Sequence, residues 1–183
     1  QLASTSLWFS ILMYIFFTIT TILFSQKITE LIFGSTMYLK VIQISIISIS
    51  ANGIYTLLIN QFRWELKSKE YGVLTILHGL TLFISIYITT IVLEYSLLGL
   101  IASQIFTSTL LIFSCYLLSK ESYNFSFNIA LLKEMLSYSL PLVPASLAIF
   151  INLFINRFTL NHYGTLADIS FFAVASRIGS IPS

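Results

Sequence analysis

The sequence consists mainly of long uncharged stretches, which are separated by short charged or turn-forming segments. A helix needs about 20 apolar residues to cross a hydrocarbon core about 30 Å thick, and five of the stretches reach that length. We predict transmembrane helices within Gln1–Gln26, Val41–Phe62, Tyr71–Leu93, Tyr95–Ser119 and Met135–Asn156. A sixth helix is expected to begin near Ile169. Stretches of this length favour helices over the short alternating strands of a membrane barrel.

The composition supports this class of protein. Hydrophobic residues make up 57% of the chain and charged residues 9%, and the mean hydropathy is +0.92. A soluble domain has about 25% charged residues, so this chain lacks the polar surface that water requires. The net charge of +2 provides no basic patch for nucleic acid. The sequence therefore predicts an all-α, polytopic transmembrane helix bundle.

The connections between the helices indicate the orientation. Lys27 and Glu30 lead into a turn at Gly34, and Glu94 alone separates the third helix from the fourth, which predicts a tight hairpin. Five basic residues fall on one side of the membrane: Arg63, Lys67, Lys69, Lys120 and Lys133. Three fall on the other side: Lys27, Lys40 and Arg157. The positive-inside rule places the first group in the cytoplasm.

A longer amphipathic connection at residues 120–134 divides the chain. We predict four transmembrane helices in residues 1–119, a cytoplasmic linker at residues 120–134, and the start of a second group of helices in residues 135–183. The chain begins without Met, and Ile178–Ser183 ends inside an apparent helix. We therefore expect a fragment of about six helices from a longer protein.

Polar residues recur at intervals of three and four in the first four predicted helices, which places them on one face of each helix. These residues are Ser10, Tyr14, Thr18, Thr21 and Ser25; Ser45, Ser48, Asn52 and Thr56; Thr75, His78, Ser85 and Thr89; and Ser103, Thr107 and Ser114. One explanation is packing, because Ser and Thr join helices within membranes. The other is a shared polar interior that lines a hydrated cavity. Both explanations remain open at this point.

The sequence contains no pattern typical of catalysis or metal binding. Cys115 is the single cysteine, and neither His78 nor His162 has a second ligand at metal-binding spacing. The first five predicted helices contain no Asp or Glu, which argues against acid–base chemistry within the membrane. We predict no catalytic residue, no metal, no cofactor and no enzymatic activity. His78 is either a hydrogen-bonded histidine of the bundle or a contact for substrate or a proton.

The fifth predicted helix has two unusual features. Pro141 and Pro144 lie inside it, and a broken helix is tolerated in a membrane where it lines a cavity or is packed against protein. Asn152 and Asn156 are stacked on one face just before Arg157. A guanidinium at this depth either reaches the lipid headgroups or binds an anion such as phosphate. Arg177 in the sixth helix has the same alternatives, and Asp168 is a candidate ion-pair partner for either arginine.

This region carries a resemblance to a known family. The segment Leu132–Pro144, with the sequence LKEMLSYSLPLVP, resembles the entry to the seventh helix of polysaccharide and O-antigen flippases. Asn156–Phe158 followed by Tyr163–Gly164 is similar to the exit of that helix, and Phe171–Ile178 is similar to the next helix. The spacing of the earlier loops is similar to that of helices three to six. Asn156 departs from the family pattern, which often has Asp, and Ile169–Phe172 stands where relatives often have Gly-Ile-Tyr-Ser.

The resemblance implies a MATE-like exporter of the multidrug, oligosaccharidyl-lipid and polysaccharide superfamily, with two six-helix lobes around a cavity. The chain would hold helices three to eight, with the lobe linker at residues 120–134. It would translocate a lipid-linked oligosaccharide, such as an O-antigen repeat unit of lipopolysaccharide, across the bacterial cytoplasmic (inner) membrane by alternating access. The implied partners are undecaprenyl-diphosphate-linked oligosaccharide, membrane lipids and other polysaccharide assembly proteins. Arg157 and Arg177 would contribute to the lining that holds the pyrophosphate, and Asn152 and Asn156 would contact the sugars.

Three other functions remain open. The same fold also serves ion-coupled export of drugs or small amphipathic molecules. A membrane polysaccharide polymerase would be expected to have large loops with Arg, His or carboxylate residues, whereas the loops here are short. A purely structural assembly subunit would leave the polar faces of four helices without a purpose other than packing.

Overall fold

The structure is a computed structural model that describes the backbone of residues 2–120, 123 and 126–179. It describes their side chains except at residues 96, 153, 156–158, 160–163, 166–169 and 177–179. The elements in chain order are α1 (Leu2–Leu23), α2 (Ser25–Phe33), α3 (Leu39–Trp64), α4 (Ser68–Ile86), the π-helix η1 (Tyr87–Val92), α5 (Ser96–Leu118), α6 (Ile129–Ser139), the 3₁₀ turn η3 (Leu140–Leu142), α7 (Val143–Tyr163) and α8 (Leu166–Gly179). The described part of the chain contains no strand, so the predicted all-α class is confirmed.

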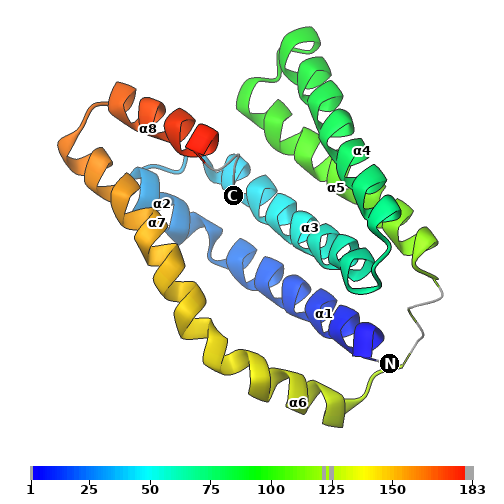
Figure 1. Ribbon diagram of the computed structural model, residues 1–183. Helices are drawn as coiled ribbons and strands as arrows, with labels where there is room; N and C mark the ends of the chain where they lie inside the picture. Colours follow the sequence, from blue (N-terminus) through cyan, green and yellow to red (C-terminus); the bar gives the residue numbers. More distant parts are fainter. Residues whose placement is uncertain (1, 121–122, 124–125, 180–183) are drawn as a thin grey trace. The chain divides into compact units, whose positions relative to one another are not determined.

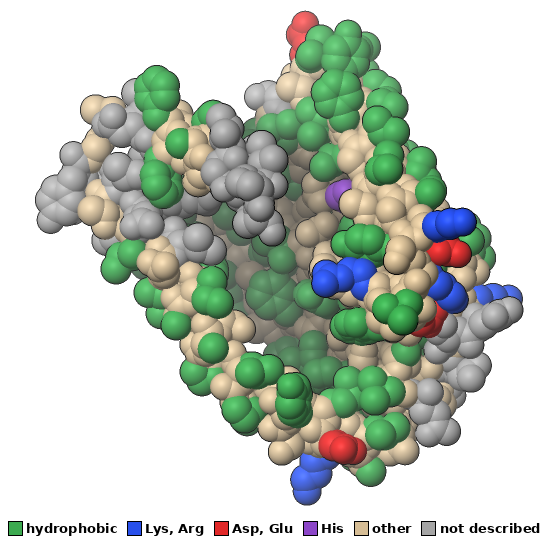
Figure 2. All heavy atoms as spheres, in the orientation of Figure 1, with side chains coloured by type: hydrophobic (Ala, Val, Ile, Leu, Met, Phe, Trp, Pro, Cys, Tyr) green, Lys and Arg blue, Asp and Glu red, His purple; other side chains and the backbone are tan. Residues whose placement is uncertain are grey.

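In the part of the chain that the structure describes, five helical segments are long and apolar enough to cross a membrane: Leu2–Leu23, Leu39–Trp64, Ser68–Val92, Leu97–Leu118 and Ile129–Asn152. Their outer faces are hydrophobic, as expected for contact with lipid. Leu12, Phe16 and Phe83 are 59%, 66% and 70% exposed. Figure 2 shows hydrophobic side chains along α4 and α6. The chain is therefore a multi-pass helical membrane protein.

Residues 1–131 and 132–183 form two compact units. In the first unit, α3 packs against α1, α2, α4 and α5 and is the central helix (Figure 1). The apolar core of this unit consists of Leu7, Tyr55, Leu58, Ile59, Phe62, Leu74, Leu111, Cys115 and Tyr123. It lies at the end of the bundle where α3 ends and α4 begins, which is the end with Arg63, Lys67 and Lys69.

Small residues on α5 allow its close approach to α3 and α4. Ser103, Thr107 and Ser108 are at most 1% exposed. Small side chains of this kind let membrane helices make close van der Waals contact. At the other end of α4, Glu94 at the hairpin turn has φ +55°, and a Cβ added to Gly99 would lie 3.1 Å from the carbonyl oxygen of Thr89.

The helix boundaries differ from the prediction in several places. The helix predicted to end at Asn156 continues in α7 to Tyr163, and α8 begins at Leu166 rather than near Ile169. Two other differences have local causes. The charged residues Lys27 and Glu30 lie within α2, which continues to a turn at Gly34, where φ is +66° and the amide donates to Glu30 O. A glycine ends a helix in this conformation without steric cost. The fifth apolar helical segment begins six residues before Met135, because Asn128 Oδ1 accepts hydrogen bonds from the Ala130 and Leu131 amides at 2.9 and 3.3 Å and caps α6.

In the second unit, η3 separates α6 from α7, and α7 packs against α8. Pro141 lies within the 3₁₀ turn. Pro144 is the second residue of α7, a position whose amide has no partner within the helix, so this proline is compatible with the helix start. The side chains of η3 and of the described start of α7 are exposed.

Candidate functional site

Four side-chain hydrogen bonds join neighbouring helices in the described part of the first unit, and each includes at least one residue of a predicted polar face. The Thr18 and Ser50 hydroxyls share a hydrogen bond of 2.7 Å between α1 and α3. The Gln104 amide of α5 donates to Asn52 Oδ1 of α3 at 3.3 Å. The remaining two pairs are Gln43 Nε2 to Ser25 Oγ at 3.1 Å and Thr89 Oγ1 with Ser103 Oγ at 2.7 Å. These residues therefore contribute to packing between helices.

Other polar residues satisfy their donors within their own helix. Thr21, Thr56, Thr75 and Ser114 each donate to the carbonyl oxygen four residues earlier, at 2.7 to 3.1 Å. A hydroxyl bonded in this way is compatible with contact to lipid, because its hydrogen has a partner. These four residues do not need a cavity to explain them.

Two adjoining hollows remain on the face formed by α1, α3 and α5. The first, of about 420 Å³, is lined by Phe9, Ser10, Met13, Tyr14, Phe17 and Ile49. The second, of about 290 Å³, is lined by Ser45, Ser48, Ile49, Leu100, Ile101 and Gln104. Ile49 belongs to both, so we name their combined lining the Ile49 surface. It combines aromatic and aliphatic groups with hydroxyls and one amide, and none of its lining residues is charged.

Tyr14 is held on this surface by a close contact with α3. A Cβ added to Gly53 would overlap the phenol ring of Tyr14. Gly53 therefore allows the ring to lie directly against the α3 backbone, which determines where the Tyr14 hydroxyl can lie. At the other side of the surface, the hydrogen bond to Asn52 Oδ1 restrains the position of the Gln104 side-chain amide.

His78 lies elsewhere, in the contact between α3 and α4. Its ring stacks on Tyr55, with centroids 4.5 Å apart and an interplanar angle of 8°. Its Nε2 atom is buried without a hydrogen-bond partner among the described residues. No group of three His, Cys, Asp or Glu residues that could bind a metal occurs in the part of the chain that the structure describes. His78 is therefore separate from the Ile49 surface, and its proposed substrate contact stays a prediction.

The remaining predicted site residues belong to the second unit. Asn152 is exposed on α7. The backbones of Asn156 and Arg157 are in α7 and that of Arg177 is in α8, but these three side chains lie outside the described part of the structure. The side chains of Asp168 and His162 also lie outside it. The structure therefore leaves the predicted anion site untested.

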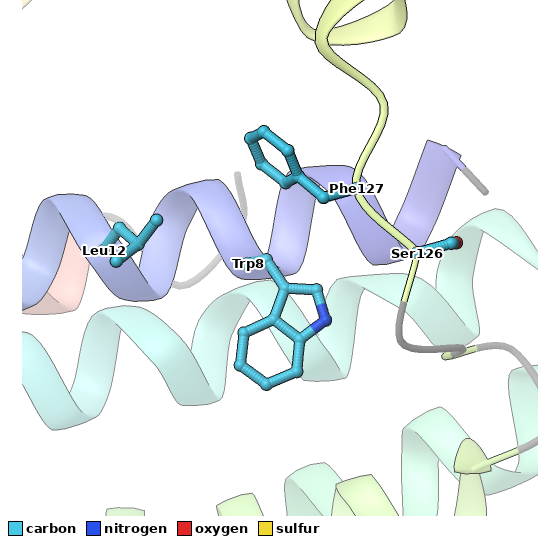
Figure 3. Close-up of a pocket in the computed structure, with 4 residues that line it drawn as sticks. All are labelled: Trp8, Leu12, Ser126 and Phe127. Carbon is cyan, nitrogen blue, oxygen red and sulfur yellow. The ribbon is translucent and has the colours of Figure 1, made fainter.

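A smaller hollow of about 240 Å³ lies between α1 and the connection to α6. Figure 3 shows Trp8 and Leu12 of α1 with Phe127 of the connection, and the Ser126 side chain turned away from them. The backbone N–H of Asn128, which is nearby, donates a hydrogen bond to Thr5 Oγ1 of α1 at 3.2 Å. These contacts hold the connection against the start of α1. The lining of this hollow is mostly apolar, so it offers few hydrogen-bond partners to a polar ligand.

The same connection contains Tyr123, which is 8% exposed and stacks on Tyr116 at a centroid distance of 6.4 Å. Burial, together with the nearby Glu65 carboxylate and Cys115, raises the pKa of Tyr123 to about 12. The phenol therefore stays neutral at physiological pH and acts as a packing residue of the core.

The pattern of polar residues did not predict Gln43, Ser50, Gln104 or Ile49. Ser50 does not follow the spacing of Ser45, Ser48 and Asn52, and an isoleucine among many apolar residues gives no signal. Gln104 could have been identified, because an amide inside an apolar helix is costly unless it has a partner.

The family model described as "Polysaccharide biosynthesis protein" matches residues 1–183. No curated protein and no solved structure shows a significant match to the chain.

Proposed function

Since this chain belongs to the polysaccharide biosynthesis protein family, we propose that it translocates a lipid-linked oligosaccharide across the bacterial cytoplasmic membrane. The substrate would be a polysaccharide or O-antigen repeat unit attached to undecaprenyl diphosphate. Transport would proceed by alternating access of two lobes, with residues 120–134 as the linker between them. The observation that carries the proposal is the uncharged Ile49 surface on three membrane-crossing helices.

The chemistry of the Ile49 surface fits a sugar. Each sugar hydroxyl that leaves water needs new hydrogen-bond partners, because an unpaired polar group in an apolar medium is costly. Ser45, Ser48 and Gln104 supply donors and acceptors on one side of Ile49, and Ser10 and Tyr14 supply them on the other. The aromatic rings beside Ser10 and Tyr14 offer flat surface to the apolar faces of a sugar ring.

The diphosphate requires a different kind of partner, which the Ile49 surface lacks. In this proposal Arg157 and Arg177 bind the phosphate oxygens, because a guanidinium donates two parallel hydrogen bonds to such groups. Asn152 and Asn156 would contact the first sugars. Arg157 has Asn156 rather than an acidic residue before it, so no immediately preceding carboxylate competes with the diphosphate.

Export of a small amphipathic molecule is the second candidate. The larger hollow, with Phe9, Met13, Tyr14 and Phe17, has about 420 Å³ and a mostly apolar lining. Pockets of this size and chemistry bind drug-sized ligands. The two candidates differ in their need for Gln104. A small amphipathic molecule in the larger hollow does not require the Gln104 amide, which lines the neighbouring hollow.

The test uses the full-length protein in vesicles with a fluorescent polyprenyl-diphosphate oligosaccharide. Gln104→Leu should slow translocation about five- to tenfold, since one hydrogen bond contributes about 1 kcal/mol. Thr75→Val is the control, because the Thr75 hydroxyl is bonded within its own helix, and it should have little effect. Equal rates for Gln104→Leu and the unsubstituted protein would contradict the assignment of the Ile49 surface.

Deletion of the gene in its own host tests the function itself. Accumulation of the lipid-linked oligosaccharide on the cytoplasmic leaflet, reversed by the gene, would support translocation. Normal lipid-linked pools together with increased sensitivity to amphipathic cations would favour drug export. Accumulation of single repeat units on the outer leaflet would favour a polymerase.

A further inference from the structure

A groove runs between the first half of α4 and the last half of α5, away from the Ile49 surface. It has a volume of about 440 Å³ and is lined by Lys69, Glu70, Val73, Leu74, Leu77, Ser114 and Leu118. Its floor is Leu74, which is buried, whereas Val73, Leu77 and Leu118 are exposed along its sides. The Ser114 hydroxyl donates to Leu110 O, so it demands no partner from a ligand. The body of the groove is therefore suited to a hydrocarbon chain.

Two opposite charges lie at one end of this groove. Lys69 and Glu70 are in the first turn of α4, and the described part of the structure shows no hydrogen bond or ion pair for either side chain. Their charged neighbours are engaged: Lys67 Nζ is 2.7 Å from Glu65 Oε2, and the Arg63 guanidinium lies 6.0 Å from the centre of the Tyr71 ring. The three hollows described above have no charged side chain in their linings.

We propose that this groove binds a phospholipid with a zwitterionic headgroup that contains a phosphate and a primary ammonium. The phosphate would meet the Lys69 ammonium, and the ammonium of the lipid would meet the Glu70 carboxylate. One acyl chain would then follow Val73, Leu74 and Leu77. A purely anionic headgroup is disfavoured, because Glu70 would repel it.

The dimensions of the groove agree with this occupant. Lys69 and Leu77 are eight residues apart on a continuous helix, which corresponds to about 12 Å at 1.5 Å per residue. One leaflet contributes about 15 Å to the hydrocarbon core, so an acyl chain that starts at Lys69 stays beside the groove for most of its length. The charged end also coincides with the α3–α4 loop, where lipid headgroups of the cytoplasmic leaflet are expected.

The experiment measures which lipids stay bound to the full-length protein. The protein is reconstituted in vesicles of equal parts phosphatidylethanolamine and phosphatidylglycerol, extracted in mild detergent, and analysed by native mass spectrometry. The unsubstituted protein should retain phosphatidylethanolamine in excess. Glu70→Gln should reduce this excess about two- to fivefold, in line with the strength of exposed ion pairs. Lys69→Gln should weaken binding of both lipids.

Two controls separate this site from general lipid adhesion. Glu30→Gln and Lys27→Gln change the same residue types at the opposite end of the bundle, outside the groove, and should leave the lipid ratio unchanged. Leu77→Trp fills the groove and should reduce retention of both lipids without altering the charges. The proposal is wrong if phosphatidylglycerol is retained in excess, if neither lipid is retained, or if Glu30→Gln changes the ratio as much as Glu70→Gln.

Discussion

Replacement of Gly53 by alanine should disturb the Ile49 surface with only a modest effect on folding. The added methyl group would overlap the Tyr14 ring, so the ring must move. The overlap involves the outer end of the Tyr14 side chain, which can move more readily than backbone. The Tyr14 hydroxyl is then displaced from its place in the larger hollow.

The expected magnitude follows from two opposing terms. Overpacking at a close contact costs about 1–3 kcal/mol. Alanine in place of glycine inside a helix is favourable by about 1 kcal/mol. We therefore expect Gly53→Ala to lower the free energy of unfolding by about 0–2 kcal/mol. Gly79→Ala is the matched control, because a Cβ there meets nothing within 4 Å, and it should raise the free energy of unfolding by up to about 1 kcal/mol.

The assay combines chemical unfolding in detergent with translocation of the fluorescent lipid-linked oligosaccharide in vesicles. A double-mutant cycle with Tyr14→Ala isolates the contact, because without the ring Gly53→Ala should behave like Gly79→Ala. Translocation should slow in Gly53→Ala and not in Gly79→Ala. If the two glycine substitutions change stability and translocation equally, the close contact between Tyr14 and α3 does not exist as described.

Further predictions concern hydrogen bonds, the pKa of a buried phenol and a helix cap. Thr89→Val removes a hydroxyl that lies 2.7 Å from Ser103 Oγ and 3.1 Å from a backbone carbonyl of α5, and it should lower the free energy of unfolding by about 0.6–1.7 kcal/mol. Thr75→Val, whose hydroxyl is bonded within α4, should change the same free energy by less than about 0.5 kcal/mol. Because the folded pKa of Tyr123 is raised from 10.0 to about 12, the unfolded chain loses this proton first as the pH rises. The free energy of unfolding should therefore fall between about pH 10 and pH 12, and Tyr123→Phe should make that fall smaller in a pH series of unfolding curves. Asn128→Ala removes the cap of α6 and should cost about 1 kcal/mol, seen as faster limited proteolysis at residues 126–131, whereas Asn128→Asp should keep the cap.

Most of the fold could be predicted from the sequence because membrane helices must be long and uncharged. Among the described residues, this requirement predicted each of the five helical segments that are long and apolar enough to cross a membrane. Their ends are displaced, and the fifth segment is interrupted by the 3₁₀ turn η3. The displaced ends have local causes that composition does not reveal. The Asn128 cap extends α6 toward its N-terminus, and α2 keeps Lys27 and Glu30 within a helix until Gly34 ends it.

The candidate site was less predictable, because a polar face on a helix does not identify its partner. Thr18 bonds to Ser50, a residue outside the predicted polar face of the second helix, whereas Thr21 on the same predicted face bonds to its own backbone. The spacing of residues determines which side of a helix is polar. Which hydroxyl then meets another helix, and which one faces lipid, depends on the distance between helices at that level.

The distribution of these contacts connects the fold to the proposed transport. The apolar core of the first unit gathers at the basic end, around Phe62 and Leu111. The hydrogen bonds between helices lie farther along, at Ser25, Thr18 and Thr89. A close-packed apolar core cannot open without leaving cavities, which cost free energy in proportion to their volume. A hydroxyl pair can instead exchange its partner for a sugar hydroxyl, because one hydrogen bond replaces another. The half of the bundle with the polar pairs can therefore admit a glycan at a lower cost in free energy than the apolar core. The Ile49 surface lies in this half, and the Asn52–Gln104 pair lies beside it.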